Sequence, residues 1–390
     1  MDIRLIVKIY NPTKQKGAVN LNKILLNGLH YEKNGAGISK YTQMLIKQFI
    51  SEKYDVDILI RNEFKNDYDA SNVIVSAQDI NGSKDRIIYE QIKSKKLYDR
   101  YELVHFPDYA TPVLYRGYQV ATIHDMAMHT MKDKYTRMQN ITKNILLKNT
   151  IRNADKLICV SEFSKNELIK YYPEAEKRSV VIYEGIEIPN LKVDQDIEGK
   201  ILKEFRLSGE GTRYILYVGT IAPHKNIKRL ISAFGRINHL IPEYKLVIAG
   251  KKGWMYSDVF EEVEKLSLSK RVVFTDFADE TKLEVLYSNA EIFVSASLYE
   301  GFGFPPLEAM IRKIPVLVSD IEIFRETCIN VAEYFNPMEI EDISDKMLKL
   351  IRDESKKTRL AEAGYERARF FSWEKTARET FEIYKSILDK

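Results

Sequence analysis

The chain has 390 residues, which exceeds the usual range of a single hydrophobic core and predicts two domains. Charged residues make up 30% and apolar residues 45%, as in ordinary globular proteins, and a net charge of +4 is too small to indicate nucleic-acid binding. No apolar run approaches the roughly 20 residues that span a bilayer, and the first residues lack a signal-peptide pattern, so we expect a cytoplasmic protein.

The distribution of charge and the two cysteines indicate what the protein contacts and whether its thiols are reduced. Residues 1–190 carry 29 Lys+Arg and 23 Asp+Glu, a net +6, whereas residues 191–390 carry 31 and 33, a net −2. The basic excess favours an anionic acceptor or peripheral contact with an anionic membrane, although a solvated basic face is the more common cause. Cys159 and Cys328 lie in or near apolar runs, which predicts buried, reduced thiols rather than a disulfide.

The first half alternates strand and helix patterns. After residues 1–22, which fit no element and include a turn-like basic stretch at 11–17, the first strand is predicted at 23–27. Further apolar strands are predicted at 54–60, 71–75, 103–106, 119–125, 156–161 and 179–183, and helices at 38–50, 87–97, 135–153 and from Ser161, which should cap its helix. Such alternation predicts an α/β domain with a parallel sheet.

Two places in this half suit a ligand. Gly35 and Gly37 lie between the first strand and its helix, where backbone N–H groups can meet a phosphate, although a flexible loop explains them equally well. His124 ends a strand, and ligands bind at the carboxyl ends of parallel strands, although a lone histidine is more often structural or exposed. Asp125 would orient the imidazole or cap the next element.

The strand pattern stops over residues 186–212, where Pro189 and several glycines punctuate charged sequence, and then restarts. We therefore predict an N-terminal Rossmann-like domain at 1–190, with 1–22 as an extension, and a linker at 191–212. A C-terminal Rossmann-like domain follows at 213–370, and an amphipathic terminal helix at 371–390 begins with Ser372 as its cap and Trp373 as an apolar anchor.

The second half repeats the alternation. Strands are predicted at 214–219, 244–249, 272–274, 291–295 and 316–319, and helices at 227–240, 260–268, 282–288, 307–313 and 340–353. Lys225 ends the loop between the first of these strands and its helix, where a phosphate could reach it, although a surface lysine is the alternative. Asp194 and Asp196 have the spacing of metal ligands but fall in the predicted linker, so we interpret them as solvated.

The stretch from Glu300 to Met310 carries the strongest signal. A buried strand leads into a turn containing Gly301 and Gly303, and Pro305 suits the start of the following helix. Backbone N–H groups and the helix dipole converge there and favour an anion, whereas Glu300 and Glu308 would accept hydrogen bonds from hydroxyls. The pattern predicts a ligand with both phosphate and sugar, although a glutamate near a helix start is common for dipole reasons alone.

This stretch resembles the signature of the retaining GT-B glycosyltransferases of family 4, in which two glutamates are separated by seven residues. The resemblance covers nearly the whole chain from Lys23 to Leu388 and is strongest over 214–235 and 270–326. It implies two Rossmann-like domains with parallel sheets that face each other across a cleft, and a C-terminal helix that crosses back to the first domain.

The resemblance also implies roles for individual residues. Lys225 would contact the diphosphate of a nucleotide sugar, Glu300 the hydroxyls of the transferred sugar, Glu308 the ribose, and His124 the sugar or the acceptor. Thr220 stands where many members carry a second basic residue, so the second charge is open. The remaining implied donor contacts are Gly35, Gly37, Gly301, Phe302, Gly303 and Phe304, with Phe277 and Ala278 near the base.

The implied function is retaining, metal-independent transfer of a hexose from a nucleotide diphosphate sugar to a hydroxyl. The resemblance implies a front-face mechanism without a further cofactor, and an acceptor that is a glycan or a lipid-linked oligosaccharide in surface polysaccharide synthesis. The loop from Gly219 to Asn226 resembles those of mannosyltransferases, which favours GDP-mannose slightly over a UDP sugar. The alternatives are a GT-B nucleotide-sugar 2-epimerase and a non-catalytic nucleotide-sugar-binding subunit.

Overall fold

The computed structural model describes residues 22–33, 35, 37–131 and 136–389. The turn expected at 11–17, nearly all of the expected extension and the first residue of the helix expected from Tyr135 lie outside the described residues. The chain divides into two compact units. The first comprises Met1–Thr122, Thr142–Leu157 and Phe381–Lys390, and the second comprises Ile123–Ile141 and Ile158–Thr380.

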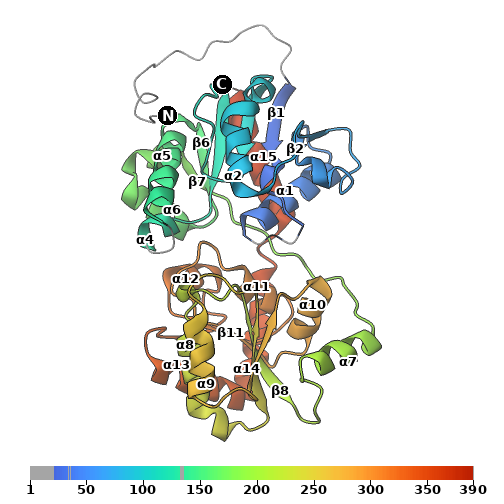
Figure 1. Cartoon of the computed structure of the whole chain (residues 1–390), viewed down its shortest axis with the longest axis vertical. Coiled ribbons are helices and arrows are strands. Elements are labelled where there is room, and N and C mark those ends of the chain that lie inside the picture. Colours follow the sequence, from blue (N-terminus) through green and yellow to red (C-terminus); the bar gives the residue numbers. More distant parts are fainter. Residues whose placement is uncertain (1–21, 34, 36, 132–135, 390) are drawn as a thin grey trace. The chain divides into compact units, whose positions relative to one another are not determined.

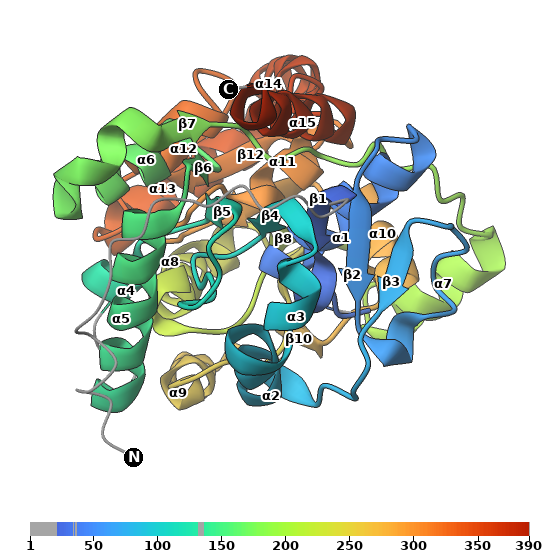
Figure 2. The same cartoon turned by 90° about the horizontal axis from the view of Figure 1, so that it is seen from above.

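Seven strands form the first sheet in the order β3-β2-β1-β4-β5-β6-β7, and Figure 2 shows them in this order. The pairs β1–β2, β1–β4, β2–β3 and β4–β5 are parallel. The strands are β1 Asn22–Asn27, β2 Asp57–Ile60, β3 Val73–Val75, β4 Tyr101–Phe106, β5 Tyr118–Ile123, β6 Lys156–Cys159 and β7 Ser179–Val181. Central strands such as β1 and β4 are largely buried on both faces because helices cover both sides.

The helices of this half follow the predicted alternation and differ mainly at their ends. The helix expected at 87–97 begins earlier, at Gly82, and ends at Tyr98. It is irregular because a π-helical turn at Tyr89–Lys93 separates two α-helical pieces. The helices are α1 Ile38–Ser51, α2 Gly82–Ile88, α3 Lys95–Tyr98, α4 Ala127–Thr130, α5 Arg137–Asn153 and α6 Glu162–Tyr171. The Ser161 hydroxyl accepts from the Ser164 N–H, so the predicted cap of α6 is confirmed.

The C-terminal helix α15 (Trp373–Leu388) reaches the first sheet. Neighbouring residues of a strand point to opposite faces, and β4 shows both. On one face the Tyr384 hydroxyl lies 2.5 Å from His105 Nδ1, and on the other the ring of Phe106 packs edge-on against Tyr98 of α3. Figure 2 accordingly shows α15 and α3 on opposite sides of the sheet, which confirms the predicted return of the helix.

Six strands form the second sheet in the order β10-β9-β8-β11-β12-β13, and all of its pairs are parallel. The strands are β8 Arg213–Val218, β9 Tyr244–Ala249, β10 Val272–Asp276, β11 Ile292–Ser295, β12 Val316–Ser319 and β13 Glu333–Phe335. The helices are α8 Ile227–Ile237, α9 Ser257–Lys265, α10 Glu280–Ser288, α11 Phe304–Met310, α12 Glu322–Thr327, α13 Ile340–Arg352 and α14 Glu354–Ala368, most of them labelled in Figure 1. The chain is thus α/β with two Rossmann-like parallel sheets, as predicted.

The region expected as a linker contains a helix, α7 (Gln195–Glu204). Its Ile201 side chain is buried in the core of the second sheet together with Phe205. The Asp194 carboxylate accepts from the Asp196 N–H and caps this helix. Asp194 and Asp196 are both exposed, as expected for solvated side chains.

The structure also describes the two cysteines and the apolar character of the helices. Cys159 and Cys328 are both buried thiols, and burial raises the pKa of each to about 12. Such thiols stay protonated at neutral pH and react slowly. Within the described part of the chain, no helix combines the length and the apolar character that a membrane crossing requires.

Candidate active site

The second sheet reverses its strand order beside β8, because β9 and β10 lie on one side of it and β11 to β13 on the other. The loops that leave β8 and β11 therefore diverge, and ligands of open α/β sheets bind in the crevice between such loops. Lys225 ends the loop after β8, and Glu300 lies in the loop after β11. The topology thus brings together two residues that are 75 positions apart in the sequence.

Lys225 and Glu300 form a direct ion pair, with 2.5 Å between Nζ and Oε1, and each side chain is only 16% exposed. Lys225 is positioned by a short 3-10 turn, Pro223–Lys225, and its N–H donates to the Ala222 carbonyl. The Ser297 hydroxyl donates to the same Glu300 oxygen at 2.7 Å. The site thus contains a largely buried cation and anion that hold each other in place.

Electrostatics keep the Glu300 carboxylate ionised. Burial alone would raise its pKa, but the charge of Lys225, together with hydrogen bonds from Lys225 and Ser297, lowers the pKa below the usual value. Beneath this pair, burial first and the nearby Glu300 charge second raise the pKa of Tyr217 well above its ordinary range. An ionised carboxylate accepts hydrogen bonds only, which suits the hydroxyls of a sugar.

The turn after Glu300 is held by close backbone packing. A side chain at Gly301 would place its Cβ only 2.1 Å from the His124 carbonyl oxygen, so only glycine fits. The Gly301 carbonyl accepts from the hydroxyls of Ser161 and Ser164, at 2.7 and 3.1 Å. Gly303 adopts a positive φ of 90° as the residue before α11, where glycine is favoured. Both predicted glycines are therefore required by the shape of the turn.

Helix α11 begins at Phe304, three residues earlier than predicted, because Gly303 provides the left-handed residue before it. Glu308 consequently lies in the second turn, where the dipole explanation for a glutamate no longer applies. Its Oε2 accepts from the Tyr287 hydroxyl at 3.1 Å. Phe302 is 3% exposed and packs in the core, and Phe304 stacks on Trp373, so these two side chains support the turn from beneath.

His124 follows β5, as predicted, and it lies against the turn that carries Glu300, through the contact of its carbonyl with Gly301. Its Nδ1 lies 3.0 Å from Oε1 of Glu184, and the two side chains are 12% and 2% exposed. Asp125 Oδ1 accepts from the Ala127 N–H at 2.8 Å. Asp125 therefore binds the first N–H of α4, although the N-cap residue of this helix is Met126, and a different carboxylate contacts the imidazole.

The other residues of the second unit for which the resemblance implied a donor contact follow strands of the sheet. Thr220 follows β8 and is exposed. Phe277 follows β10, is 44% exposed, and has the Lys251 ammonium 4.3 Å from its ring centroid. Ala278 beside it is half-buried. An exposed aromatic ring beside a cation offers a flat surface for a nucleobase.

Gly35 and Gly37 belong to the first unit. A Cβ at Gly35 would lie 2.2 Å from the Ser39 hydroxyl, and Gly37 has a φ of 56° as the residue before α1. Both glycines are thus needed locally to turn the chain into α1. These observations concern only the local backbone, and the expected contact of both glycines with a donor phosphate stays a prediction.

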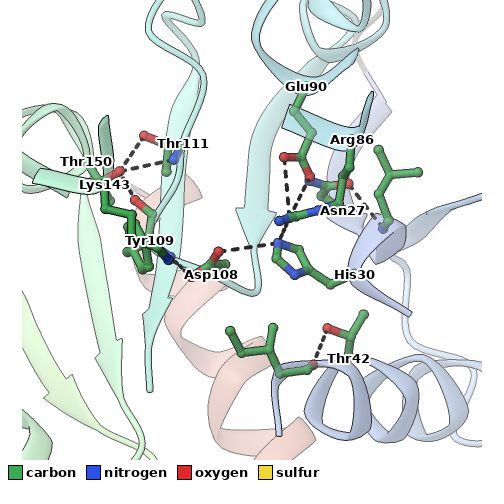
Figure 3. Close-up of polar contacts among 12 residues, drawn as sticks. Asn27, His30, Thr42, Arg86, Glu90, Asp108, Tyr109, Thr111, Lys143 and Thr150 are labelled. Carbon is green, nitrogen blue, oxygen red and sulfur yellow. Dashed lines mark hydrogen bonds and ion pairs between the residues drawn. The ribbon is translucent and has the colours of Figure 1, made fainter. Parts of the chain in front are cut away.

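The first sheet reverses its strand order between β1 and β4, and a buried polar cluster lies at that point (Figure 3). Glu90, 2% exposed, accepts from Asn27 at the end of β1 and from Arg86. Arg86 also contacts His30, whose Nε2 lies 3.6 Å from Asp108, just after β4. Burial, the larger influence, raises the Glu90 pKa, which the Arg86 charge and the Asn27 hydrogen bond oppose. Sequence reasoning missed this cluster.

Two residues of the second unit were also missed. Glu184 follows β7 closely, and Ser297 follows β11, so both lie at the carboxyl edge where His124 and Glu300 were expected. The same rule that singled out His124 could have found Glu184, because it asks for polar residues just after a strand. Nothing in the sequence indicated that Glu184 would contact His124 rather than solvent.

Comparison with known proteins fits this architecture. Residues 200–367 match the family model described as glycosyl transferases group 1, and residues 35–188 match that of Glycosyltransferase Family 4. The two matches include every strand of both sheets except β1, and the chain belongs to this family of glycosyltransferases with the GT-B fold. The expected family is confirmed, and retention of the anomeric configuration stays a prediction.

Two individual relatives are also glycosyltransferases, and one solved structure shares the fold. The chain is 27% identical to O-antigen chain mannosyltransferase B of Escherichia coli, over 69% of this chain and 70% of the relative. It is 30% identical to O-antigen chain mannosyltransferase RfbU of Salmonella typhimurium, over 56% of this chain and 57% of the relative. The structure of Anabaena HepE in complex with UDP and glucose aligns with a TM-score of 0.75 at 17% identity, over 93% and 99% of the two chains.

Proposed function

We propose that this glycosyltransferase moves a hexose, with retention, from a nucleotide diphosphate sugar to a hydroxyl of a glycan or lipid-linked oligosaccharide in surface polysaccharide synthesis. The observation that carries the proposal is the Lys225–Glu300 pair at the strand-order reversal of the second sheet. A cation there can neutralise the diphosphate as it leaves, and the carboxylate beside it can accept from sugar hydroxyls. The proposed place of action is the cytoplasmic side of the membrane.

GDP-mannose is the donor favoured slightly over a UDP sugar. The two relatives described above are O-antigen mannosyltransferases, which supports mannose, whereas HepE is seen with UDP and glucose. Phe277 would stack on the base, and Glu308 would accept from the ribose. No observation favours a 2-epimerase or a non-catalytic subunit.

The proposed chemistry uses no metal ion or other cofactor. Lys225, the backbone N–H groups of residues 301–304 and the start of α11 are the positive groups offered to the diphosphate. Departure of the diphosphate breaks the anomeric C–O bond, and the acceptor oxygen forms the new bond to the anomeric carbon on the same face of the sugar. The departing diphosphate oxygen takes the proton of this acceptor hydroxyl. Glu300 and His124 act by binding and orienting the sugar and the acceptor.

A panel of GDP and UDP sugars tests the proposal directly. One of them should raise the unfolding temperature and be hydrolysed slowly in the absence of acceptor, with the same rate in EDTA. Lys225→Ala should reduce turnover about 10²- to 10³-fold, as expected for loss of one group that stabilises developing negative charge.

Lys228→Ala is the matched control, because Lys228 is exposed and pairs with Asp258 on the neighbouring helix. It should keep wild-type turnover. Full activity of Lys225→Ala, or a rate that EDTA abolishes and Mg²⁺ restores, would contradict the proposed chemistry. Retention is checked by the anomeric configuration of the product.

A further inference from the structure

The loop that follows β7 carries a buried carboxylate, Glu184, which no sequence pattern singled out. The chain pairs β5 with β6 and β6 with β7 up to their ends, since the Val160 N–H donates to the Ile123 carbonyl and the Ile182 N–H to the Cys159 carbonyl. His124 and Glu184 therefore leave the same edge of the sheet, on either side of the loop that starts α6.

Glu184 is 2% exposed, and a carboxylate buried to this extent is costly unless it is paired. Its Oε1 lies 3.0 Å from Nδ1 of His124. A buried carboxylate that accepts from Nδ1–H selects one tautomer of the imidazole and fixes the plane of the ring. The other ring nitrogen, Nε2, is then the hydrogen-bond acceptor.

The backbone on both sides of this contact is held firmly. The His124 carbonyl accepts from the Ser164 hydroxyl at 2.9 Å and packs against Gly301. With the backbone fixed in this way, the contact with the Glu184 carboxylate acts on the rotation and the tautomer of the imidazole.

Glu184 is fixed in turn by the start of the C-terminal helix. The Thr376 hydroxyl donates to the Tyr183 carbonyl at 2.7 Å, and the Ile186 N–H donates to the Phe371 carbonyl at 2.9 Å. A side chain at Gly185 would collide with the backbone of Trp373 at 2.3 Å. The segment that carries Glu184 is therefore clamped on both sides of this residue.

We infer that Glu184 is a positioning residue of the glycosyl transfer, acting through His124. It holds the proton on Nδ1 and directs Nε2, as an acceptor, toward a hydroxyl beside the Glu300 turn. Asp125, the neighbouring carboxylate in the sequence, accepts from the Ala127 N–H of α4 instead. This inference rests on the proposed function for its effect on rate, but the contact itself can be tested without a donor.

Imidazole ¹⁵N NMR of the wild-type protein, with His124→Gln to assign the signals, is the first experiment. At a pH where His124 is neutral, its Nδ1 should show the shift of a protonated nitrogen and Nε2 that of an unprotonated one. Glu184→Gln, which keeps the size of the side chain, should move both shifts toward the average of a histidine without a carboxylate partner. An Nε2-protonated histidine in the wild type would overturn the inference.

Kinetics form the second experiment, with the donor identified by the panel. Glu184→Ala and Glu184→Gln should each lower kcat about 10- to 100-fold with little change in the KM for donor, as for loss of a residue that orients another. Glu187→Gln, an exposed carboxylate in the same loop, is the control and should match the wild type in rate and in ¹⁵N shifts.

A double-mutant cycle separates positioning from an independent effect. Glu184→Ala should add little to the loss caused by His124→Ala, because both remove one function. Losses that multiply, or a Glu184→Gln protein with wild-type kcat, would overturn the inference. If no nucleotide sugar binds the wild type, the proposed function fails, whereas the ¹⁵N result still decides whether Glu184 sets the tautomer.

Discussion

At the scale of single residues, the most informative contact is the one between Lys225 and Glu300. In the structure each is the other's partner, at 2.5 Å, although each is proposed to serve a different part of the donor. Lys225 must turn toward the diphosphate and Glu300 toward the sugar, so binding the donor competes with the ion pair. Because the pKa of Glu300 is lowered in the folded protein, the ionised carboxylate stabilises the folded state above pH 4.5. This stabilisation is lost as the pH falls through the lowered pKa.

Replacing Glu300 should therefore affect two ligands in opposite directions. In Glu300→Gln, the nucleoside diphosphate of the preferred donor should bind about tenfold more tightly, because Lys225 no longer has to break an ion pair in order to contact it. A tenfold lower Kd corresponds to a gain of about 1.4 kcal/mol in the free energy of binding. Turnover of the complete nucleotide sugar should fall at least tenfold. Calorimetric titration and a hydrolysis assay measure the two effects.

The matched control for this change is Glu291→Gln, which breaks an ion pair with Lys357 away from the site. It should leave both measurements as in the wild type. Weaker or unchanged binding of the nucleoside diphosphate to Glu300→Gln would show that the ion pair does not oppose donor binding.

At the scale of elements, the turn between β11 and α11 depends on glycine for two different reasons. Gly303 needs its positive φ, whereas Gly301 needs the absence of a Cβ because the His124 carbonyl lies against it. The sequence placed both glycines in the turn, and the family resemblance implied that both contact the donor. The structure shows that at Gly301 the close neighbour is the protein's own backbone.

Gly301→Ala should therefore destabilise the protein by about 1–3 kcal/mol and reduce activity, because the new methyl group forces the turn away from His124. Gly199→Ala is the control. Gly199 lies in α7 with no atom within 4 Å of a Cβ, so this change should stabilise the protein by about 0.5–1 kcal/mol. Chemical denaturation measures both, and a Gly301→Ala protein of wild-type stability would contradict the packing argument.

At the scale of the whole molecule, part of the basic excess of the first half is concentrated on one helix, α5. Helix α5, labelled in Figure 1, carries Arg137, Lys143, Lys148 and Arg152 and no acidic residue. Three large apolar side chains at helical spacing are exposed along it. They are Met138, 70% exposed, Ile141, 49%, and Ile145, 43%. Exposed apolar groups among cations suit the surface of an anionic bilayer, which is the peripheral contact we propose.

Vesicles that contain anionic lipid should accordingly bind the protein, and neutral vesicles should bind it weakly. Met138→Asp combined with Ile145→Asp should reduce binding about tenfold or more, since two apolar contacts are lost and negative charge is added. Leu240→Asp, at an exposed apolar position of the second unit, is the control and should leave binding unchanged. Sedimentation with vesicles measures the affinity, and equal binding of all three proteins would exclude α5 as the contact.

The order of strands and helices, the family, and the positions of Lys225, Glu300 and His124 just after strands could be predicted from the sequence by itself. These features are local: an apolar run of four to six residues makes a strand, a glycine turn ends it, and Lys225, Glu300 and His124 stand just after strands. Helix ends were less predictable, as at α11 and in the π-helical turn at Tyr89–Lys93, because caps and packing against distant residues set them.

The tertiary structure alone decided which of these residues meet. The reversal of strand order beside β8 joins Lys225 to Glu300, and the alignment of β5 with β7 joins His124 to Glu184. Pairings of this kind depend on strand order and register, which link positions 60 to 75 residues apart and leave no periodic trace in the sequence. The sequence therefore determined which chemical groups stand at the edge of each sheet, and the fold decided that Glu184, rather than Asp125, holds the histidine.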